Sequence, residues 1–137
     1  MTGASRGIGE GAARAFARTG ASVVLVARNE SGLAAVETRI LEEVPKAQVL
    51  KIALDVIDPT EVEAAVARAV EIFGGVDMLV AAAGRMRAAN AGRSCIWNVH
   101  IWKLTLTPLM KVISQTDPDE WWNTVEVNLR GVFNFVR

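Results

Sequence analysis

Three glycines, with a serine and an arginine between them, open the sequence in a spacing that suits anion binding. Residues 2–9 read TGASRGIG, and apolar residues at helical spacing follow over 7–19. Glycines let a backbone turn tightly and approach a ligand closely, and the first N–H groups of a helix are unpaired and lie at the positive end of its dipole. The combination predicts a loop that binds a phosphate or pyrophosphate. A glycine-rich turn without a ligand is the alternative for this feature taken alone.

The elements expected to position this loop alternate between strand and helix. Short runs rich in β-branched residues predict buried strands at 22–27, 48–54 and 76–82. Apolar stripes with capping residues predict helices over 32–44 with Ser31 as its cap, from Asp58-Pro59 to Gly74-Gly75, and over 118–135. This alternation predicts an α/β fold, a doubly wound parallel sheet with helices on both faces.

Composition excludes several classes of protein. The 137 residues are 51% hydrophobic, which fits one domain with a core, and 15 basic and 15 acidic side chains leave no net charge. This balance argues against a nucleic-acid binder, which needs an excess of Lys and Arg. No apolar run reaches the ~18 residues of a membrane span. No signal peptide opens the chain and Cys95 is the only cysteine, so we expect a reducing, cytoplasmic environment.

A change in composition divides the chain near residue 91. All 21 alanines lie at or before Ala91, and all four tryptophans follow it. Residues 85–108 have no clear period, although IWNVHIWKLTL within them could form a strand by its β propensity. We interpret residues 86–107 as an insertion.

Four features in this order resemble the short-chain dehydrogenase/reductase family. They are TGASRGIG, Asp55-Val56 after a strand, VDMLVAAAG at 76–84, and Asn128 in VEVNLRGVF. The resemblance covers residues 2–84 and about 108–137. It implies a Rossmann fold that binds NAD(H) or NADP(H), and hydride transfer between the nicotinamide and a small-molecule alcohol or carbonyl.

The resemblance also implies that the fold is incomplete. Residues 1–137 would form a single partial domain, without the family's first strand, which should precede Thr2, and without its C-terminal half. We expect marginal stability, because the strands beside the missing one would lose a hydrogen-bonding partner.

Cofactor residues carry over from the family one at a time. Those of the pyrophosphate loop are Gly3, Ser5, Arg6, Gly7, Ile8 and Gly9. Asp55 and Val56 match the pair at the adenine ring, with an ordinary turn residue as the alternative for Asp55. Ala82, Ala83 and Gly84 stand where the family has Asn-Ala-Gly, so the amide that helps to order the site is missing at Ala82. The similar Asn90-Ala91-Gly92 does not directly follow a strand, and we interpret it as a decoy.

The end of the strand at 22–27 bears on the choice of cofactor. An acidic residue there would accept hydrogen bonds from the adenine ribose of NAD. This chain has Ala27 followed by Arg28, and a guanidinium suits the 2′-phosphate of NADP. Arg6 in the glycine loop adds a second cation. The two arginines favour NADP over NAD, with a solvated strand end as the alternative for Arg28.

The family's catalytic groups are mostly absent from this chain. The resemblance implies a tyrosine that exchanges a proton with the substrate, a lysine four residues later, a serine and an asparagine. Asn128 matches the asparagine, with an ordinary polar residue on the helix over 118–135 as the alternative. The sequence contains no tyrosine, and Cys95, His100 and Lys111 lie in no recognisable catalytic context. We therefore expect a catalytically incomplete chain.

Two other functions stay open beside a short-chain oxidoreductase. The first is a non-catalytic nucleotide-binding module. The second is a pairing role, as a homo-oligomer through the helix over 118–135, where the adjacent Trp121 and Trp122 cannot both face one core.

Overall fold

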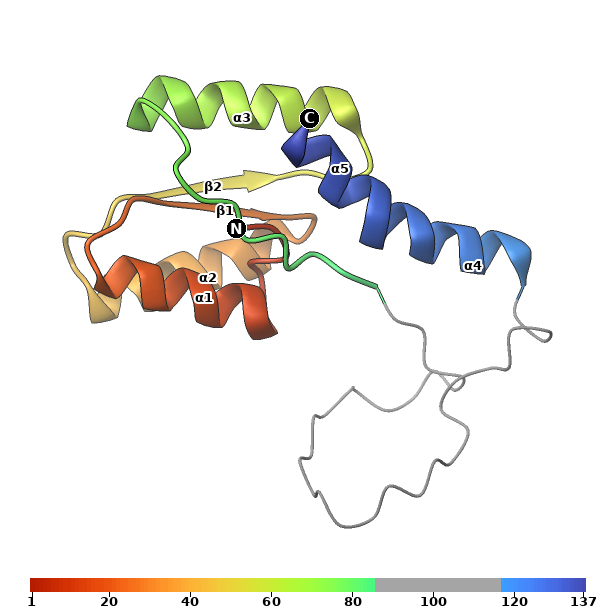
Figure 1. The fold of residues 1–137 in the computed structure, drawn as a ribbon. Helices are drawn as coiled ribbons and strands as arrows, with labels where there is room; N and C mark the ends of the chain where they lie inside the picture. The colour runs from red at the N-terminus through yellow and green to blue at the C-terminus, as the bar shows by residue number, and fades with distance from the viewer. Residues whose placement is uncertain (86–116) are drawn as a thin grey trace, which may run out of the picture.

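The computed structural model describes residues 1–85 and 117–137, which form a parallel two-stranded sheet with helices on both faces (Figure 1). In chain order, the elements are α1 (Gly7–Arg18), β1 (Val23–Ala27), α2 (Glu30–Glu43), β2 (Val49–Ala53), α3 (Pro59–Phe73), α4 (Pro118–Val125), the π-helical η2 (Glu126–Arg130) and α5 (Gly131–Val136). β1 and β2 pair from Val23↔Val49 to Ala27↔Ala53. Helices α1 and α2 lie on one face of the sheet, and α3 and α5 on the other. This arrangement confirms the α/β class predicted from the sequence.

Two apolar cores form on the two faces of the sheet. Leu25 of β1 packs with Leu33 and Ile40 of α2 on one side, and all three are fully buried. The next residue of β1, Val26, packs with Val62 of α3 on the other side. Successive side chains of a strand point to opposite faces. Strands buried on both faces must therefore be apolar throughout, which is the pattern that the sequence shows.

The predicted cap of α2 is wrong by two residues. The helix begins at Glu30, and the side-chain oxygen of Asn29 accepts a hydrogen bond from the Gly32 N–H at 3.0 Å. The Ser31 hydroxyl donates to the same oxygen at 2.8 Å instead of capping the helix. Asn29 is the N-cap because it is the last residue before the helix with an extended backbone, the conformation that an N-cap needs.

The predicted ends of α3 are confirmed. The Asp58 carboxylate accepts hydrogen bonds from the Thr60 and Glu61 N–H groups at 2.8 and 3.1 Å. Pro59 occupies the first turn, where its missing N–H costs nothing. The helix ends at Gly74, whose φ of 83° is the left-handed conformation typical of glycine at a helix end.

The predicted third strand does not form. Within 76–82, only Ala81 pairs with a neighbour, through a bridge to Thr2. Thr2 also bridges to Val26 on its other side, and its N–H donates to the Val80 carbonyl at 2.9 Å. Thr2 therefore lies between β1 and Ala81, and residues 76–80 form no ladder with any part of the chain that the structure describes.

The predicted C-terminal helix is continuous but not uniform. The Asp117 carboxylate caps it by accepting from the Asp119 N–H at 3.0 Å, and it runs from Pro118 to Val136. Its middle turn is the π-helical η2, which contains Asn128. Several sequence predictions lie outside the described residues: the insertion at 86–107, the alternative strand within it, Asn90-Ala91-Gly92, and Cys95, His100 and Lys111.

An ion cluster joins α1 to the end of α2, and it makes stability depend on pH. Arg14 and Arg18 donate to the Glu43 carboxylate, with Nε distances of 2.9 and 3.0 Å. The hydrogen bond from Arg14 lowers the pKa of Glu43 below its ordinary value. A lowered pKa in the folded state stabilises the fold above the ordinary pKa, and this contribution is lost as the pH falls through the folded value.

We expect Glu43→Gln to lose this acid-side dependence and to change stability only slightly near neutral pH, because the pair is exposed. Thermal unfolding between pH 3 and 7 measures the effect. Glu42→Gln is the matched control, since Glu42 makes no ion pair with any residue in the described ranges. Equal pH profiles for the two variants would contradict a role for the cluster.

Candidate functional site

The glycine loop folds onto itself and onto residues 82–83 without room for side chains. A Cβ on Gly3 would lie 2.6 Å from the Ala82 carbonyl oxygen, and one on Gly9 would lie 2.4 Å from the Gly3 oxygen. Gly3 and Gly7 have φ of 64° and 61°, a left-handed conformation that costs other residues about 1–2 kcal/mol. The loop conformation therefore requires glycine at these positions, and its main chain is exposed to any ligand that rests on it.

The loop leads directly into α1, which has no side-chain cap. Arg6 is the N-cap residue, and its side chain makes no capping hydrogen bond. The N–H groups of the first turn and the positive end of the helix dipole can therefore serve an anion. Arg6 and Ile8 are exposed beside it, and Ile8 is 79% exposed. The Ala4 N–H donates to the Val26 carbonyl at 3.1 Å, which holds the loop at the end of β1.

The start of α2 packs against the other side of the loop. A Cβ on Gly32 would lie 3.0 Å from the Ser5 Cβ and 3.3 Å from the Asn29 Cγ. Arg28 lies directly before Asn29, with its side chain 67% exposed, and its Nη1 is 3.6 Å from the Asp55 Oδ2. The structure thus brings Ser5, Arg28 and Asp55 to the carboxyl-terminal edge of the sheet, where open α/β folds bind ligands.

Asp55 and Val56 are held differently. The Asp55 carboxylate accepts from the Ile57 N–H at 3.3 Å, so Asp55 does form a turn of its own while it faces Arg28. Val56 is buried, and its carbonyl accepts from the Asn134 Nδ2 at 3.0 Å. A Cβ on Gly131 would lie 2.6 Å from the Val56 Cγ2. The C-terminal helix therefore fixes the position of Val56.

Sequence reasoning missed Asn134 and Gly131. Asn134 is buried, with 7% of its surface exposed. Its side-chain amide donates the hydrogen bond that the buried Val56 carbonyl needs. The available signals were an asparagine between two phenylalanines and a glycine inside a helix, a position where glycine usually has a packing reason.

Residues 82–85 are tied to both ends of the chain. The Thr2 Oγ1 accepts from the Ala83 N–H at 3.0 Å. The Asn128 Oδ1 accepts from the Arg85 N–H at 2.7 Å, and its Nδ2 donates to the Arg85 carbonyl at 2.8 Å. Gly84 packs beside the same side chain, since a Cβ on it would lie 3.4 Å from the Asn128 Oδ1. Asn128 therefore satisfies both backbone groups of Arg85.

Asn128 lies within the π-helical turn η2. Single π-helical turns within α-helices are frequent at functional sites. Asn123, on α4, accepts a hydrogen bond from the Arg85 side chain. The two asparagines together bring the C-terminal helix against the segment that borders the glycine loop.

Residues 1–85 and 117–137 lack two other kinds of feature. They contain no helix that is long and apolar enough to cross a membrane. They also contain no cluster of three His, Cys, Asp or Glu side chains that could hold a metal ion.

Comparison with known proteins agrees with this geometry. The sequence profile of the family described as short chain dehydrogenase matches residues 1–137. The short chain dehydrogenase mpl6 of Monascus purpureus is 42% identical over 143 residues, which cover 100% of this chain and 41% of the relative. The 3beta-hydroxysteroid dehydrogenase 2 of Eggerthella lenta is 33% identical, with 96% of this chain and 42% of the relative covered.

Solved structures give the same result. An alcohol dehydrogenase from the archaeon Thermococcus sibiricus, complexed with 5-hydroxy-NADP, superimposes with a TM-score of 0.78 and 32% identity, covering 99% of this chain and 48% of that one. The L-sorbose reductase of Gluconobacter frateurii, complexed with NADPH and L-sorbose, has a TM-score of 0.76 and 29% identity, covering 100% and 43%. The chain spans less than half the length of these relatives, and it belongs to the short chain dehydrogenase family.

Proposed function

We propose that residues 1–137 are the NADP(H)-binding part of a short-chain oxidoreductase. The observation that carries this proposal is the glycine loop at the uncapped start of α1, where a Cβ on Gly9 would meet backbone at 2.4 Å. Such a loop lets a pyrophosphate approach the main chain while the helix start neutralises its charge. The residues present therefore fit a dinucleotide.

Each part of the dinucleotide has a group of residues to hold it. The pyrophosphate would rest on the loop residues Gly3, Ser5, Arg6, Gly7, Ile8 and Gly9. The adenine end would lie by Asp55 and Val56, and Ala82, Ala83 and Gly84 would border the other end of the cofactor. When bound, the nicotinamide supplies or accepts the hydride. The chain itself binds and orients the cofactor.

NADP rather than NAD is the proposed cofactor, because Arg28 stands at the end of β1 and no acidic residue follows that strand directly. The Arg28 Nη1 lies 3.6 Å from the Asp55 Oδ2, which is longer than a hydrogen bond and leaves guanidinium donors for a phosphate. The Thermococcus and Gluconobacter relatives, complexed with 5-hydroxy-NADP and NADPH, support this choice.

We expect Arg28→Ala to weaken NADPH binding roughly tenfold to a hundredfold, because one charged hydrogen-bond pair contributes about 1.5–3 kcal/mol. NADH binding should change little, since NADH has no 2′-phosphate. Fluorescence titration with both cofactors measures the two affinities. Arg68→Ala, which removes an exposed arginine on α3, is the matched control. Equal NADPH affinity in the Arg28 variant and the wild type would remove Arg28 from the account.

We also infer that this chain binds cofactor without completing the reaction. It contains no tyrosine, so no phenol can exchange a proton with a substrate alcohol or carbonyl. Asn128 matches the family's catalytic asparagine, and here its side chain holds Arg85. Mixing the chain with NADPH and a panel of carbonyl compounds tests this inference. We expect saturable binding and no oxidation of NADPH, and turnover would overturn it.

A pairing role is the second candidate, and one surface favours it. Trp121 and Trp122 are 47% and 57% exposed, with ring centroids 5.8 Å apart. Trp122 continues into an apolar strip with the exposed Leu129 and Phe133 along the same helix. Aromatic residues are enriched in protein interfaces. Sedimentation of the wild type and a Trp122→Glu variant tests whether copies associate through this helix.

A further inference from the structure

The carboxyl-terminal edge of the sheet carries four segments in a fixed order. β1 pairs with β2, and Thr2 bridges β1 on one side and Ala81 on the other, with every pairing parallel. The residues that follow the four segments are, in order across this edge, Asp55, Arg28, the glycine loop and 82–85. A dinucleotide with its 2′-phosphate at Arg28 and its pyrophosphate on the glycine loop therefore extends its nicotinamide half toward residues 82–85.

Arg85 is the charged residue of that segment, and the C-terminal helix holds it at three points. Its backbone N–H donates to the Asn128 Oδ1 at 2.7 Å, and its carbonyl accepts from the Asn128 Nδ2 at 2.8 Å. Its side-chain Nη1 donates to the Oδ1 of Asn123, one turn earlier on the same helix. The backbone and the guanidinium of Arg85 are therefore both fixed at this end of the edge.

The guanidinium of Arg85 keeps most of its hydrogen-bonding capacity. A guanidinium has five N–H donors, and Asn123 accepts from one nitrogen of Arg85. Asn123 is neutral, so this contact leaves the positive charge in place. Within residues 1–85 and 117–137, no carboxylate forms an ion pair with Arg85, and the residue is exposed. Arg85 thus presents an oriented cation on the side where the nicotinamide half would lie.

Resting on the proposed NADP(H) function, we propose that Arg85 binds the phosphate and ribose oxygens on the nicotinamide side of the pyrophosphate, and that Asn123 is the positioning residue that orients its guanidinium. The planar fork of a guanidinium matches the oxygens of a phosphate. A long side chain loses rotamer freedom when it binds a ligand, and the hydrogen bond to Asn123 removes part of that cost before the cofactor arrives.

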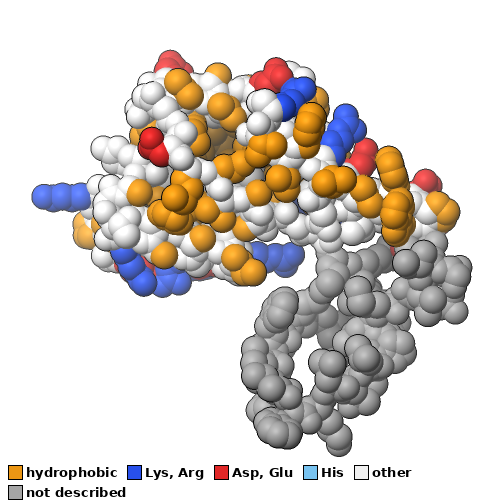
Figure 2. All heavy atoms as spheres, viewed as in Figure 1, with side chains coloured by type: hydrophobic (Ala, Val, Ile, Leu, Met, Phe, Trp, Pro, Cys, Tyr) orange, Lys and Arg blue, Asp and Glu red, His pale blue; other side chains and the backbone are white. Residues whose placement is uncertain are grey.

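A second arginine on the C-terminal helix provides a matched control. Figure 2 shows apolar side chains gathered along this helix, and its apolar strip includes Trp122, Leu129 and Phe133. Arg130 borders the same strip and pairs with Glu126, with its side chain 55% exposed. Arg130→Ala therefore removes an exposed arginine from the same helix without touching the contacts of the proposed site.

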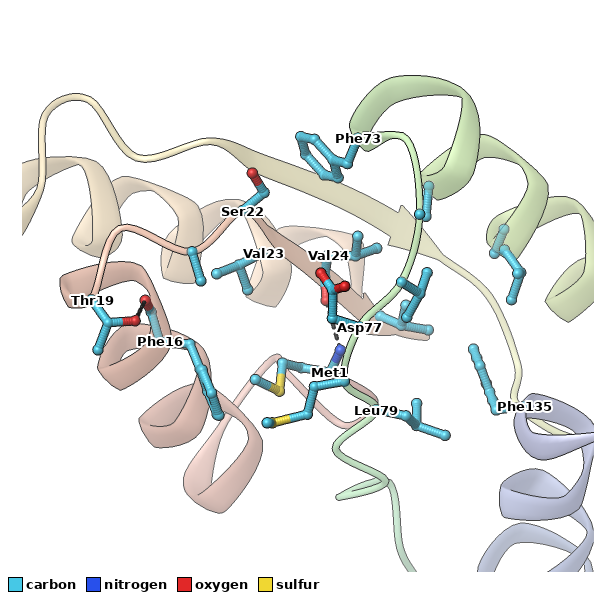
Figure 3. A pocket seen from close by; sticks show the side chains of 18 residues that line it. Met1, Phe16, Thr19, Ser22, Val23, Val24, Phe73, Asp77, Leu79 and Phe135 are labelled. Atoms are coloured by element: carbon cyan, nitrogen blue, oxygen red, sulfur yellow. Dashed lines mark hydrogen bonds between the residues drawn. The ribbon is translucent and has the colours of Figure 1, made fainter.

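The proposed site shares no residue with the cavity of about 470 Å³ that β1 and residues 75–79 border (Figure 3). Phe16 and Phe73 face that cavity from two different helices. Neither Arg85 nor the two asparagines that hold it belong to its lining. The binding role of Arg85 is therefore independent of what the cavity contains.

Three ligands that share the 2′-phosphate divide the cofactor at its pyrophosphate. NADPH is complete, 2′-phospho-ADP-ribose lacks the nicotinamide ring, and adenosine 2′,5′-bisphosphate lacks everything beyond the phosphate on the adenosine side. We expect Arg85→Ala to weaken the first two about tenfold and to leave the third within about twofold of wild type. Calorimetric titration of the full chain measures all three affinities, and unchanged binding of the third shows that the variant is folded.

The role of Asn123 is tested through its dependence on Arg85. Asn123→Ala should weaken NADPH and 2′-phospho-ADP-ribose about threefold, because the guanidinium loses its orientation but keeps its charge. Asn123→Asp retains the accepting oxygen and should restore both affinities. In the Arg85→Ala background, Asn123→Ala should cause no further loss, since its partner is already gone. Arg130→Ala should leave all three ligands at wild-type affinity.

Several results would overturn the proposal. Equal losses for the three ligands in Arg85→Ala would make the residue structural, and a loss for NADPH alone would assign it to the nicotinamide ring. Unchanged NADPH affinity in Arg85→Ala, or an equal effect of Arg130→Ala, would remove Arg85 from the site. A further loss on adding Asn123→Ala to Arg85→Ala would end the positioning role.

The same titrations separate this proposal from the proposed function. If the wild-type chain binds none of the three ligands, both are wrong. If it binds all three and Arg85→Ala changes none of the affinities, the cofactor site stands and only the role of Arg85 is lost.

Discussion

Replacing Gly9 by alanine should abolish NADPH binding and lower the free energy of unfolding by about 2 kcal/mol or more. The new Cβ would lie 2.4 Å from the Gly3 oxygen, 2.7 Å from the Gly3 carbonyl carbon and 3.0 Å from the Thr2 oxygen. All three atoms are backbone, so no side-chain rotation relieves the contact. The loop must open, and opening it withdraws the main chain from the pyrophosphate.

Alanine substitutions at Gly11 and Gly7, in the same region, are controls for Gly9→Ala with smaller expected effects on stability. A Cβ on Gly11 meets nothing within 4 Å, so Gly11→Ala should stabilise α1 by about 0.5–1 kcal/mol and leave binding unchanged. Gly7 also has open space but a φ of 61°, so Gly7→Ala should cost about 1–2 kcal/mol and still fold. Thermal unfolding and NADPH titration of the three variants measure both effects. Wild-type affinity in Gly9→Ala would contradict the account of the loop.

Gly131→Ala should lower the free energy of unfolding by about 1–3 kcal/mol and weaken NADPH binding with it. Its Cβ would lie 2.6 Å from the Val56 Cγ2, and valine has no flexible end that could move aside. The helix must shift away from the loop that carries Val56. Denaturant unfolding and cofactor titration of the variant measure both consequences.

A double variant separates this contact from a general loss of stability. Val56→Ala alone should be destabilising, because it removes buried methyl groups. In the double variant, Val56→Ala has removed the Val56 Cγ2 that the new Cβ would contact. Gly131→Ala should therefore lower the free energy of unfolding much less in that background than in the wild type. Additive effects of the two substitutions would show that Gly131 and Val56 do not meet as described.

Much of the fold was predictable because local chemistry determines it. Asp58, Pro59 and Gly74 each suit one position of α3, and the structure uses all three as expected. The apolar strands indicated a sheet covered on both faces. The cap of α2 was mispredicted because Asn29 and Ser31 are both good capping residues, and the end of the preceding strand decides between them.

The remaining features depend on contacts between distant segments, which no local pattern encodes. Residues 76–82 have the composition of a strand, but pairing needs a neighbour, and within residues 1–85 and 117–137 Thr2 alone bridges to them. Asn128, in the π turn, accepts a hydrogen bond from the N–H of Arg85, 43 residues away. The role of Asn134 depends on the Val56 carbonyl, 78 residues away. Residue types predicted the candidate site, and these contacts position it.

Calorimetric titration of the 137-residue chain with NADPH and with NADH tests the central claim most directly. The account predicts saturable binding of one NADPH per chain, with NADH bound about tenfold or more weakly, and loss of both in Gly9→Ala. Absence of NADPH binding by a folded chain, or binding that survives in Gly9→Ala, would contradict the claim that the glycine loop holds a dinucleotide.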